Sequence, residues 1–196
     1  MLEVQIRPAS YQDLPALIAA LGQEHHFRDC LARQDAGRGV LLMASIANVP
    51  VGDMFLRLEP AEEPELRDRL PGVPLLQHLE VHPSRRDRLI GTQLLGFAER
   101  LLREAHGADR VALGVGLDSG DAIRLYQRQG YRQWPYPPIA TTRVEYEPDG
   151  TPRYSPDRCQ IMVKDLRGTG GVVPRQRALD DPLESTVDEE RRGFSS

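Results

Sequence analysis

The sequence has few cysteines and no long apolar run. Its 196 residues include only Cys30 and Cys159, whose separation matches no metal-binding pattern, so we expect two reduced thiols and assign no metal ligands. No apolar stretch approaches the length that spans a membrane, and Met1 is not followed by a basic and then apolar signal segment. These features predict a cytoplasmic protein that does not bind membranes.

The chain also lacks an excess of positive charge. It has 25 Lys and Arg against 29 Asp and Glu, which gives a formal net charge of −4 and a pI near 5.8. Because nucleic-acid binding requires a basic face, DNA or RNA is not expected as the main partner. A small cationic substrate agrees better with this charge. The hydrophobic share of 40% is enough to fill the core of one domain.

Hydrophobic periodicity predicts strands and helices over residues 1–167. Strands are expected at residues 4–7, 40–46, 51–58, 75–81, 110–115, 141–146 and 160–164. Helices are expected at residues 14–21, 27–34, 65–70 and 94–105, with a last one ending near residue 129. Turns are expected at 48–50 and 149–150. This order predicts a mixed α/β fold with helices on both faces of one sheet. Residues 168–196 show no sustained periodicity, which predicts a disordered C-terminal tail.

A basic loop joins a predicted strand to a predicted helix within residues 75–102. The loop carries Arg85, Arg86, Arg88, Gly91 and Thr92. A strand that leads into a helix in this way directs free backbone N–H groups and the positive end of the helix dipole to one place. Arginines beside that place add charge-assisted contacts. The segment therefore predicts a phosphate or pyrophosphate site, although a basic loop can also be a solvated turn.

This segment resembles the acetyl-CoA signature of the GNAT superfamily of N-acetyltransferases. The family pattern is a strand that ends in Val-x-Pro, then Arg/Gln-x-x-Gly-x-Gly/Ala, and then a helix. Val81 and Pro83 fit the strand end, and Arg86 and Gly91 fall on the Arg/Gln and second glycine positions. Leu89 stands where the family has its first glycine. Because a glycine lets the backbone approach the pyrophosphate closely, this departure predicts a weaker hold on the cofactor.

Two further stretches strengthen the resemblance. Residues 119–131 are similar to a later family motif, Asn-x-x-Ala-x-x-Leu-Tyr-x-x-x-Gly-Phe, with Ser119 at the Asn position and matches at Ala122, Leu125, Tyr126, Gly130 and Tyr131. Residues 4–18 look like the first strand and helix of the family. The resemblance thus covers residues 4 to about 135. It implies the GNAT fold, a central mixed and mostly antiparallel sheet in which two central strands splay apart.

The resemblance implies a function and a set of site residues. It implies transfer of the acetyl group of acetyl-CoA to an amine of a small molecule, by a protein that often forms a homodimer. The implied contacts to coenzyme A come from the strand, the loop and the start of the two helices: Leu79, Val81, Arg86, Arg88, Leu89, Ile90, Gly91, Thr92 and Ser119. The pantetheine is expected to pair with the strand at residues 79–81, and one backbone N–H there would polarise the thioester carbonyl.

Tyr126 and Glu80 are the candidate catalytic residues. Tyr126 falls on the family tyrosine that protonates the coenzyme A sulfur, and a phenol with a pKa near 10 suits a thiolate leaving group. Tyr126 can instead be a core residue of an amphipathic helix. By strand alternation Glu80 shares one face of the strand with His78 and His82. Three titratable groups on one face of a core strand are unusual, because buried charge is costly. Glu80 can alternatively pair with an arginine.

Further residues have two readings each. His25 and His26 lie in the region that covers the substrate in similar proteins, but adjacent histidines are often plain surface. Trp134 and Tyr136 either line an acceptor pocket or pack at the sheet edge.

The family assignment has rivals too. A degenerate acyl-CoA-binding protein, a transferase for another acyl group and one for a peptide amine remain open. Glycines at 114, 116 and 120 suggest a nucleotide-dependent oxidoreductase as another possible function. Their spacing, however, differs from that of the dinucleotide-binding motif.

Overall fold

The computed structural model describes residues 3–147 and 151–167. The strands are β1 Val4–Pro8, β2 Gly39–Ile46, β3 Val49–Arg57, β4 Leu75–Val81, β5 Arg110–Gly116, β6 Arg132–Gln133, β7 Ile139–Tyr146 and β8 Pro152–Asp165. The helices are α1 Leu14–Leu21, α2 Glu24–Asp35, α3 Pro64–Arg69, α4 Ile90–His106 and α5 Gly120–Arg128, with 3₁₀ turns η1 Tyr11–Asp13 and η2 Pro83–Arg85. The predicted tail at 168–196 and the predicted turn at 149–150 lie outside the described residues.

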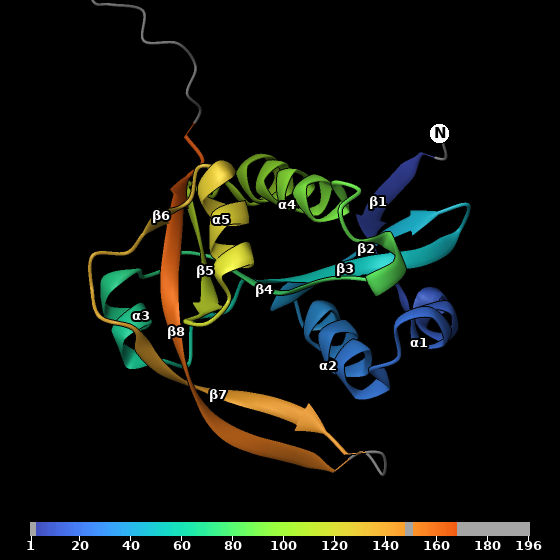
Figure 1. Ribbon diagram of the computed structural model, residues 1–196, viewed down its shortest axis with the longest axis horizontal. Helices are drawn as coiled ribbons and strands as arrows, with labels where there is room; N and C mark the ends of the chain where they lie inside the picture. Colours follow the sequence, from blue (N-terminus) through green and yellow to red (C-terminus); the bar gives the residue numbers. More distant parts are fainter. Residues whose placement is uncertain (1–2, 148–150, 168–196) are drawn as a thin grey trace, which may run out of the picture.

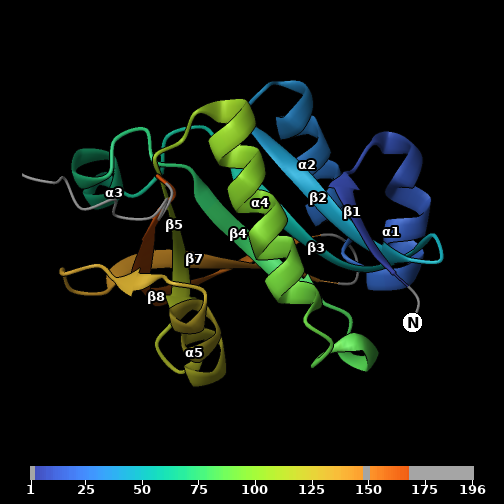
Figure 2. The ribbon, with the colours of Figure 1, turned by 90° about the horizontal axis from the view of Figure 1, so that it is seen from above.

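The strands form one sheet in the order β1-β2-β3-β4-β5-β8-β6, and β7 pairs with β8. Neighbouring strands are antiparallel except β4 and β5, which are parallel. Helices α4 and α5 lie on one side of the sheet, and α1 and α2 lie on the other (Figures 1 and 2). The predicted mixed, mostly antiparallel sheet with helices on both faces is confirmed.

Each face of the sheet has its own apolar core. Helix α4 presents a continuous stripe, Ile90, Leu94, Leu95, Ala98 and Leu102, which is fully buried against β2 to β5. Leu17 of α1 and the buried residues of α2 pack against the opposite face, and α3 covers a third cluster near β5 and β8. No helix in the described ranges is long and apolar enough to cross a bilayer.

The turn between β2 and β3 begins earlier in the chain than the predicted turn at residues 48–50. Ala47 and Asn48 form the turn, with φ values of 49° and 62°, and Val49 already pairs with Ile46. A two-residue hairpin with both φ angles positive matches the right-handed twist of the strands, and Asn tolerates that conformation. Pro50 therefore lies in β3 and not in the turn.

Strands β4 and β5 separate soon after they meet. In the described chain their pairing is limited to Leu75 with Ala112 and Leu76 with Leu113. Beyond these pairs, residues 77–81 of β4 and 114–116 of β5 diverge, and β5 continues its pairing with β8 alone. The edge of β4 that faces β5 is thus free of that partner along most of its length. This is the splay that the resemblance implies.

Candidate active site

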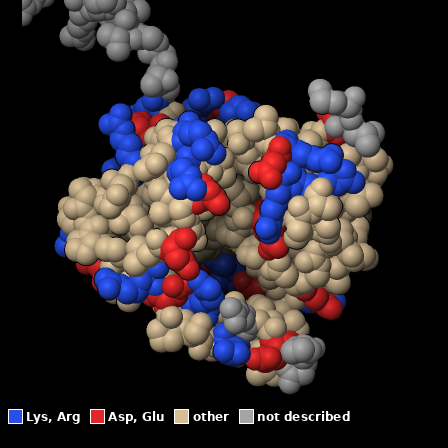
Figure 3. Space-filling model, viewed as in Figure 1, with Lys and Arg blue, Asp and Glu red and all other residues tan. Residues whose placement is uncertain are grey.

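A cavity of about 310 Å³ lies where β4 and β5 separate. Its lining includes His78 and Leu79 of β4, Gly116 of β5 and Tyr126 of α5. In the view of Figure 1 the surface is hollowed near its centre, and acidic and basic side chains surround the hollow (Figure 3). In open α/β sheets, ligands bind in the crevice beyond the carboxyl ends of the parallel strands. The cavity between the diverging ends of β4 and β5 is therefore the candidate active site.

A larger cavity of about 510 Å³ lies at the other end of the same strands. It is lined by Pro74 before β4, by residues 106–110 between α4 and β5, and by Arg167. None of the site residues predicted from the sequence is among its lining residues. We therefore assign the active site to the smaller cavity, whose lining includes Leu79 and Tyr126, two of the predicted site residues.

The basic loop leads into α4 as predicted. It forms η2 and then reaches the helix at Ile90, and the first bond along the helix runs from the Gln93 N–H to the Leu89 carbonyl. The backbone N–H groups just before Gln93 are left without an intrahelical partner by helix geometry. Arg86 reaches back to the Val81 carbonyl at 3.4 Å through Nε. The loop thus offers backbone donors and arginines at one helix end, which suits a phosphate.

Leu89 adopts the backbone conformation that explains the family glycine. Its φ is 61° and ψ is 11°, which is the left-handed region, and Asp87 is also left-handed at φ 60°. A non-glycine residue pays about 1–2 kcal/mol there. The Leu89 side chain is 70% exposed, so it points to solvent and does not fill the loop. Leucine at the family glycine position therefore costs backbone strain but does not block the interior of the loop.

A β-bulge in β4 sets which side chains face the cavity. Asp53 of β3 pairs with Glu80, but Phe55, two residues later, pairs with Gln77, so β4 has one residue more than β3 in this interval. His78 takes the strain at φ 54°. The extra residue changes the alternation, so that Gln77 and Glu80 share a face, whereas simple parity places them on opposite faces.

Glu80 and His78 lie together, as the sequence predicts. Glu80 Oε2 is 3.2 Å from His78 Nε2 and accepts a hydrogen bond of 2.6 Å from Gln23 Nε2. Among the described residues, Glu80 is therefore not paired with an arginine. The prediction that His82 shares this cluster is wrong: its ring accepts a bond from the Ser84 N–H and caps η2. His82 follows the end of β4, so strand alternation no longer governs its direction.

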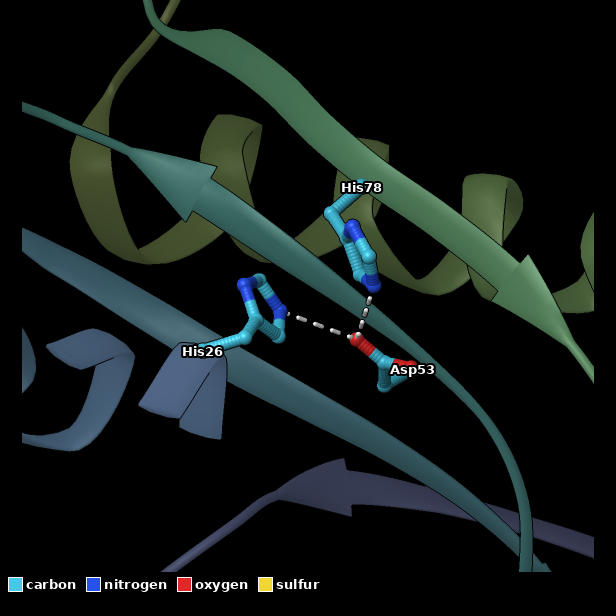
Figure 4. A group of neighbouring side chains, drawn as sticks. All are labelled: His26, Asp53 and His78. Carbon is cyan, nitrogen blue, oxygen red and sulfur yellow. Dashed lines mark ion pairs between the residues drawn. The ribbon is translucent and has the colours of Figure 1, made fainter. Parts of the chain in front are cut away.

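Asp53, which sequence reasoning missed, completes the cluster together with His26, one of the two adjacent histidines that the sequence left with two readings. Asp53 Oδ2 is 3.5 Å from His26 Nε2 and 3.8 Å from His78 Nε2. The two rings converge on the carboxylate from α2 and β4 (Figure 4). The Asp53 side chain has no exposed surface, and within the described residues neither of its oxygens accepts a hydrogen bond.

Helix α2 is held against the sheet by several contacts, and this places His26. Phe27 and Leu31 are fully buried, and Arg33 forms a 2.6 Å ion pair with Glu59 beyond the end of β3. Gln34 donates to the Ala9 carbonyl and accepts from the Leu41 N–H. These contacts fix the helix against the face of the sheet on which Asp53 lies, and this places His26 next to Asp53.

Burial shifts the pKa values of Asp53, His26 and His78 toward neutral side chains. It raises the pKa of Asp53 to about 7, mainly by desolvation, and the nearby Glu80 carboxylate adds to the shift. Desolvation lowers the pKa of His26 to about 4. The pKa of His78 is also lowered, first by burial and then by His26. Near pH 7 both imidazoles are therefore neutral and can accept a proton or ligate a cation.

Tyr126 lines the cavity and also packs on the core. Its ring meets that of Tyr131 edge-on, with centroids 5.8 Å apart. Burial raises the pKa of Tyr126, so its phenol keeps its proton at neutral pH. The two readings of this residue are thus compatible. Ser119 occupies the N-cap position of α5 without a side-chain capping bond, and it donates its N–H to the Gly116 carbonyl at the cavity edge.

Other candidates lie away from this cavity. His25 is exposed and stacks on Tyr146 of β7, with ring centroids 5.1 Å apart. Trp134 is buried beside α3, and Tyr136 packs between Trp134 and Arg69. The two aromatic residues thus pack at the sheet edge. The glycines at 114 and 116 belong to β5 and not to a phosphate loop.

One sequence signal points to the missed residue. Asp53 is the only charged residue in the apolar run of residues 49–56, Val-Pro-Val-Gly-Asp-Met-Phe-Leu, which reads as a buried strand. A charge in such a strand is costly and is therefore a functional signal. His26 has no comparable signal, because its burial depends on how α2 packs.

Comparisons with known proteins agree with this geometry. The model of the acetyltransferase (GNAT) family matches residues 8–131. Among curated proteins, an aminoalkylphosphonate N-acetyltransferase of Salmonella typhimurium is 43% identical over 58 residues, which cover 30% of this chain and 37% of that protein. The chain thus matches little more than a third of the length of this relative.

Several solved structures share the fold at low identity. A PaiA N-acetyltransferase of Thermoplasma acidophilum in complex with coenzyme A superposes with a TM-score of 0.58 at 17% identity, over 84% of this chain and 99% of that one. The ribosomal-protein-S18-alanine N-acetyltransferase of Escherichia coli gives 0.59 at 16% identity, over 87% and 99%. A GNAT family acetyltransferase of Elizabethkingia anophelis with acetyl-CoA bound gives 0.53 at 17% identity, over 83% and 97%.

Proposed function

Because the chain belongs to the GNAT family of acetyltransferases, we propose that it transfers the acetyl group of acetyl-CoA to the amine of a small molecule. One observation carries this proposal. The cavity at the splay of β4 and β5 is lined by both Tyr126 and His78, so a proton donor and the histidine of the proton-accepting cluster face the same space. Acyl transfer to an amine needs both functions at one place.

The residues present suit acetyl-CoA. Phosphates would lie at the N–H groups that precede Gln93, beside Arg86 and Arg88, where the helix dipole favours negative charge. Thr92 and Ser119 flank this region at the starts of α4 and α5. The free edge of β4 at residues 77–81 offers backbone groups to the amide-bearing arm of the cofactor. A β4 N–H that polarises the thioester carbonyl would favour the tetrahedral intermediate.

Glu80 and Tyr126 would move the protons. Glu80, next to His78 and held by Gln23, would take a proton from the substrate ammonium, directly or through a water. The neutral amine would then attack the thioester carbon to give the tetrahedral intermediate. Collapse of this intermediate breaks the C–S bond, and the nitrogen loses its second proton to solvent. Tyr126 would give its phenolic proton to the departing sulfur, and its burial keeps that proton available at neutral pH.

The cavity favours a cationic acceptor. Glu63 and Asp157 contribute carboxylates to its lining, with Glu63 accepting a hydrogen bond from Thr141 and Asp157 paired with Arg143. A protonated amine would be attracted to these acidic groups. An aminoalkylphosphonate is one amine class to test, since a curated relative of part of the chain carries that activity in its name.

A degenerate acyl-CoA-binding protein is the second candidate. Its support is the leucine at the family glycine position. The exposed Leu89 side chain weakens that support, because leucine keeps its N–H and leaves the loop interior open. Calorimetry with acetyl-CoA and with desulfo-coenzyme A addresses binding separately from turnover.

A thiol-release assay tests the proposal. Purified full-length protein is given acetyl-CoA and a panel of primary amines that includes aminoalkylphosphonates and diamines, with an alanine-starting peptide as the contrasting acceptor. We expect amine-dependent release of coenzyme A, with a small amine preferred over the peptide, and an acetylated product by mass spectrometry. Tight acetyl-CoA binding without turnover on any amine would favour the binding protein. Preference for the peptide would assign a protein amine as the acceptor.

A further inference from the structure

Asp53 has no partner that accounts for its burial. The side chain lies on the central strand β3 with no exposed surface, and within the described residues neither oxygen accepts a hydrogen bond. A buried carboxylate without a partner is strongly unfavourable, so such groups are normally paired, hydrogen-bonded or bound to a metal. A ligand that accepts electron pairs from the carboxylate would remove this cost.

Two imidazoles face the same carboxylate. His26 Nε2 lies 3.5 Å from Asp53 Oδ2, and His78 Nε2 lies 3.8 Å from it. One ligand atom from each of the three residues can be chosen so that all lie within 4.8 Å of one another. The ligand atoms of a tetrahedral site with bonds of about 2.0–2.2 Å lie about 3.3–3.6 Å apart, so small side-chain rotations would close the site.

We propose that His26, Asp53 and His78 bind one divalent transition-metal ion beside the active-site cavity. Two imidazoles and one carboxylate are a ligand set that suits zinc, iron, cobalt or nickel. His78 also lines the cavity, so the remaining coordination position is open to a water or to an oxygen atom of the acceptor molecule. The assignment differs from the sequence-based expectation of no metal ligands, because the three residues come from separate elements, α2, β3 and β4.

The alternative is a cluster held together by protons alone. A proton on Asp53 could in principle be shared with a facing imidazole nitrogen, but the separations of 3.5 and 3.8 Å are longer than hydrogen bonds. The cluster geometry supports the metal instead, since His78 Nε2 is buried and, although it lies 3.2 Å from Glu80 Oε2, it makes no hydrogen bond of normal geometry among the described residues. Both histidines are held neutral by burial, which is the form that ligates.

Direct metal binding tests the proposal without using the transferase reaction. Full-length protein is freed of metal with a chelator and titrated with ZnCl₂ by calorimetry, and with CoCl₂ by visible absorption. We expect one Zn²⁺ per chain and the absorption bands of cobalt bound to nitrogen and oxygen ligands. These titrations measure metal binding and do not depend on acetyl transfer. The metal-site proposal and the proposed transferase function can therefore fail separately.

Single substitutions and a matched control locate the site. Asp53→Asn, His26→Asn and His78→Asn should each weaken Zn²⁺ binding by at least about tenfold. His25→Asn, the neighbouring and exposed histidine of the same helix, should bind as the wild type does. Zn²⁺ should also raise the unfolding temperature of the wild type and of His25→Asn more than that of Asp53→Asn.

A second measurement uses the unaltered protein, in case a variant does not fold. All five histidines, His25, His26, His78, His82 and His106, are visible to side-chain nitrogen NMR. One equivalent of Zn²⁺ should shift the imidazole nitrogens of His26 and His78 and leave those of the other three unchanged. Absence of stoichiometric Zn²⁺ and Co²⁺ binding, or shifts confined to other histidines, would overturn the proposal and leave the proton-held cluster.

Discussion

The pH dependence of stability should change when Asp53 becomes asparagine. The folded-state pKa of Asp53 is about 7, against 3.8 for the ordinary side chain. Between these values the folded state binds more protons than the unfolded state, so this residue makes the wild type less stable as pH rises, and the loss is complete above about pH 7. Each pH unit in this window costs about 1.4 kcal/mol. From pH 5 to pH 7 the cost is therefore about 2 kcal/mol, because half of the folded molecules still carry the proton at pH 7.

Asp53→Asn removes this titration. The free energy of unfolding of the variant minus that of the wild type should rise by about 3 kcal/mol between pH 5 and pH 8, as measured by urea unfolding in a chelating buffer. His26 and His78, which also face Asp53, titrate in the opposite sense because their pKa values are lowered. Since they are present in both proteins, their contribution largely cancels in the difference.

Asp13→Asn is the matched control. Arg7 holds the pKa of Asp13 down to about 2, so its titration lies below this pH range and the corresponding difference should stay flat from pH 5 to pH 8. The reasoning is refuted if the Asp53→Asn difference is equally flat. Asp53 would then ionise normally despite its burial.

Three further variants test the rest of the site. Arg86→Ala and Arg88→Ala together should weaken acetyl-CoA binding by roughly 1–3 kcal/mol if these charges contact phosphate, and unchanged calorimetric affinity would remove the loop from the cofactor site. Leu89→Gly should raise the unfolding free energy by about 1 kcal/mol, because relief of about 1–2 kcal/mol of left-handed strain exceeds the entropic cost of glycine, and a clear drop would contradict that strain. Glu80→Gln should lower kcat/KM by about 10²-fold or more at neutral pH, whereas a rate like that of the wild type would assign proton removal to another group.

The fold was predictable because its signals are local. The stripe on α4 and the apolar runs of the strands are periodic, and the basic loop joins a strand directly to a helix, so neighbouring residues carry the information. The family motifs added the splay of β4 and β5. The hairpin turn at Ala47 and Asn48 was placed late, since Val49 and Pro50 look like turn residues when pairing is unknown.

The candidate site was predictable only in part. Tyr126 and Glu80 were chosen from motif position and alternation, and both lie in or beside the cavity region, but their catalytic roles stay predictions. The bulge at His78 cannot be seen in the sequence, because an extra residue in one strand depends on the register with its partner. The approach of His26 to Asp53 depends on packing between distant elements, which no spacing rule reports.

The effect of Tyr126→Phe on turnover tests the central claim most directly. Phenylalanine keeps the ring packed against Tyr131 but removes the proton that the departing sulfur needs. With acetyl-CoA and the best amine, and with chemistry rate-limiting, kcat from thiol release should fall about 10²–10⁴-fold, while acetyl-CoA affinity and unfolding temperature stay unchanged. A Tyr126→Phe protein that turns over like the wild type would contradict acetyl transfer through this cavity with Tyr126 as the acid.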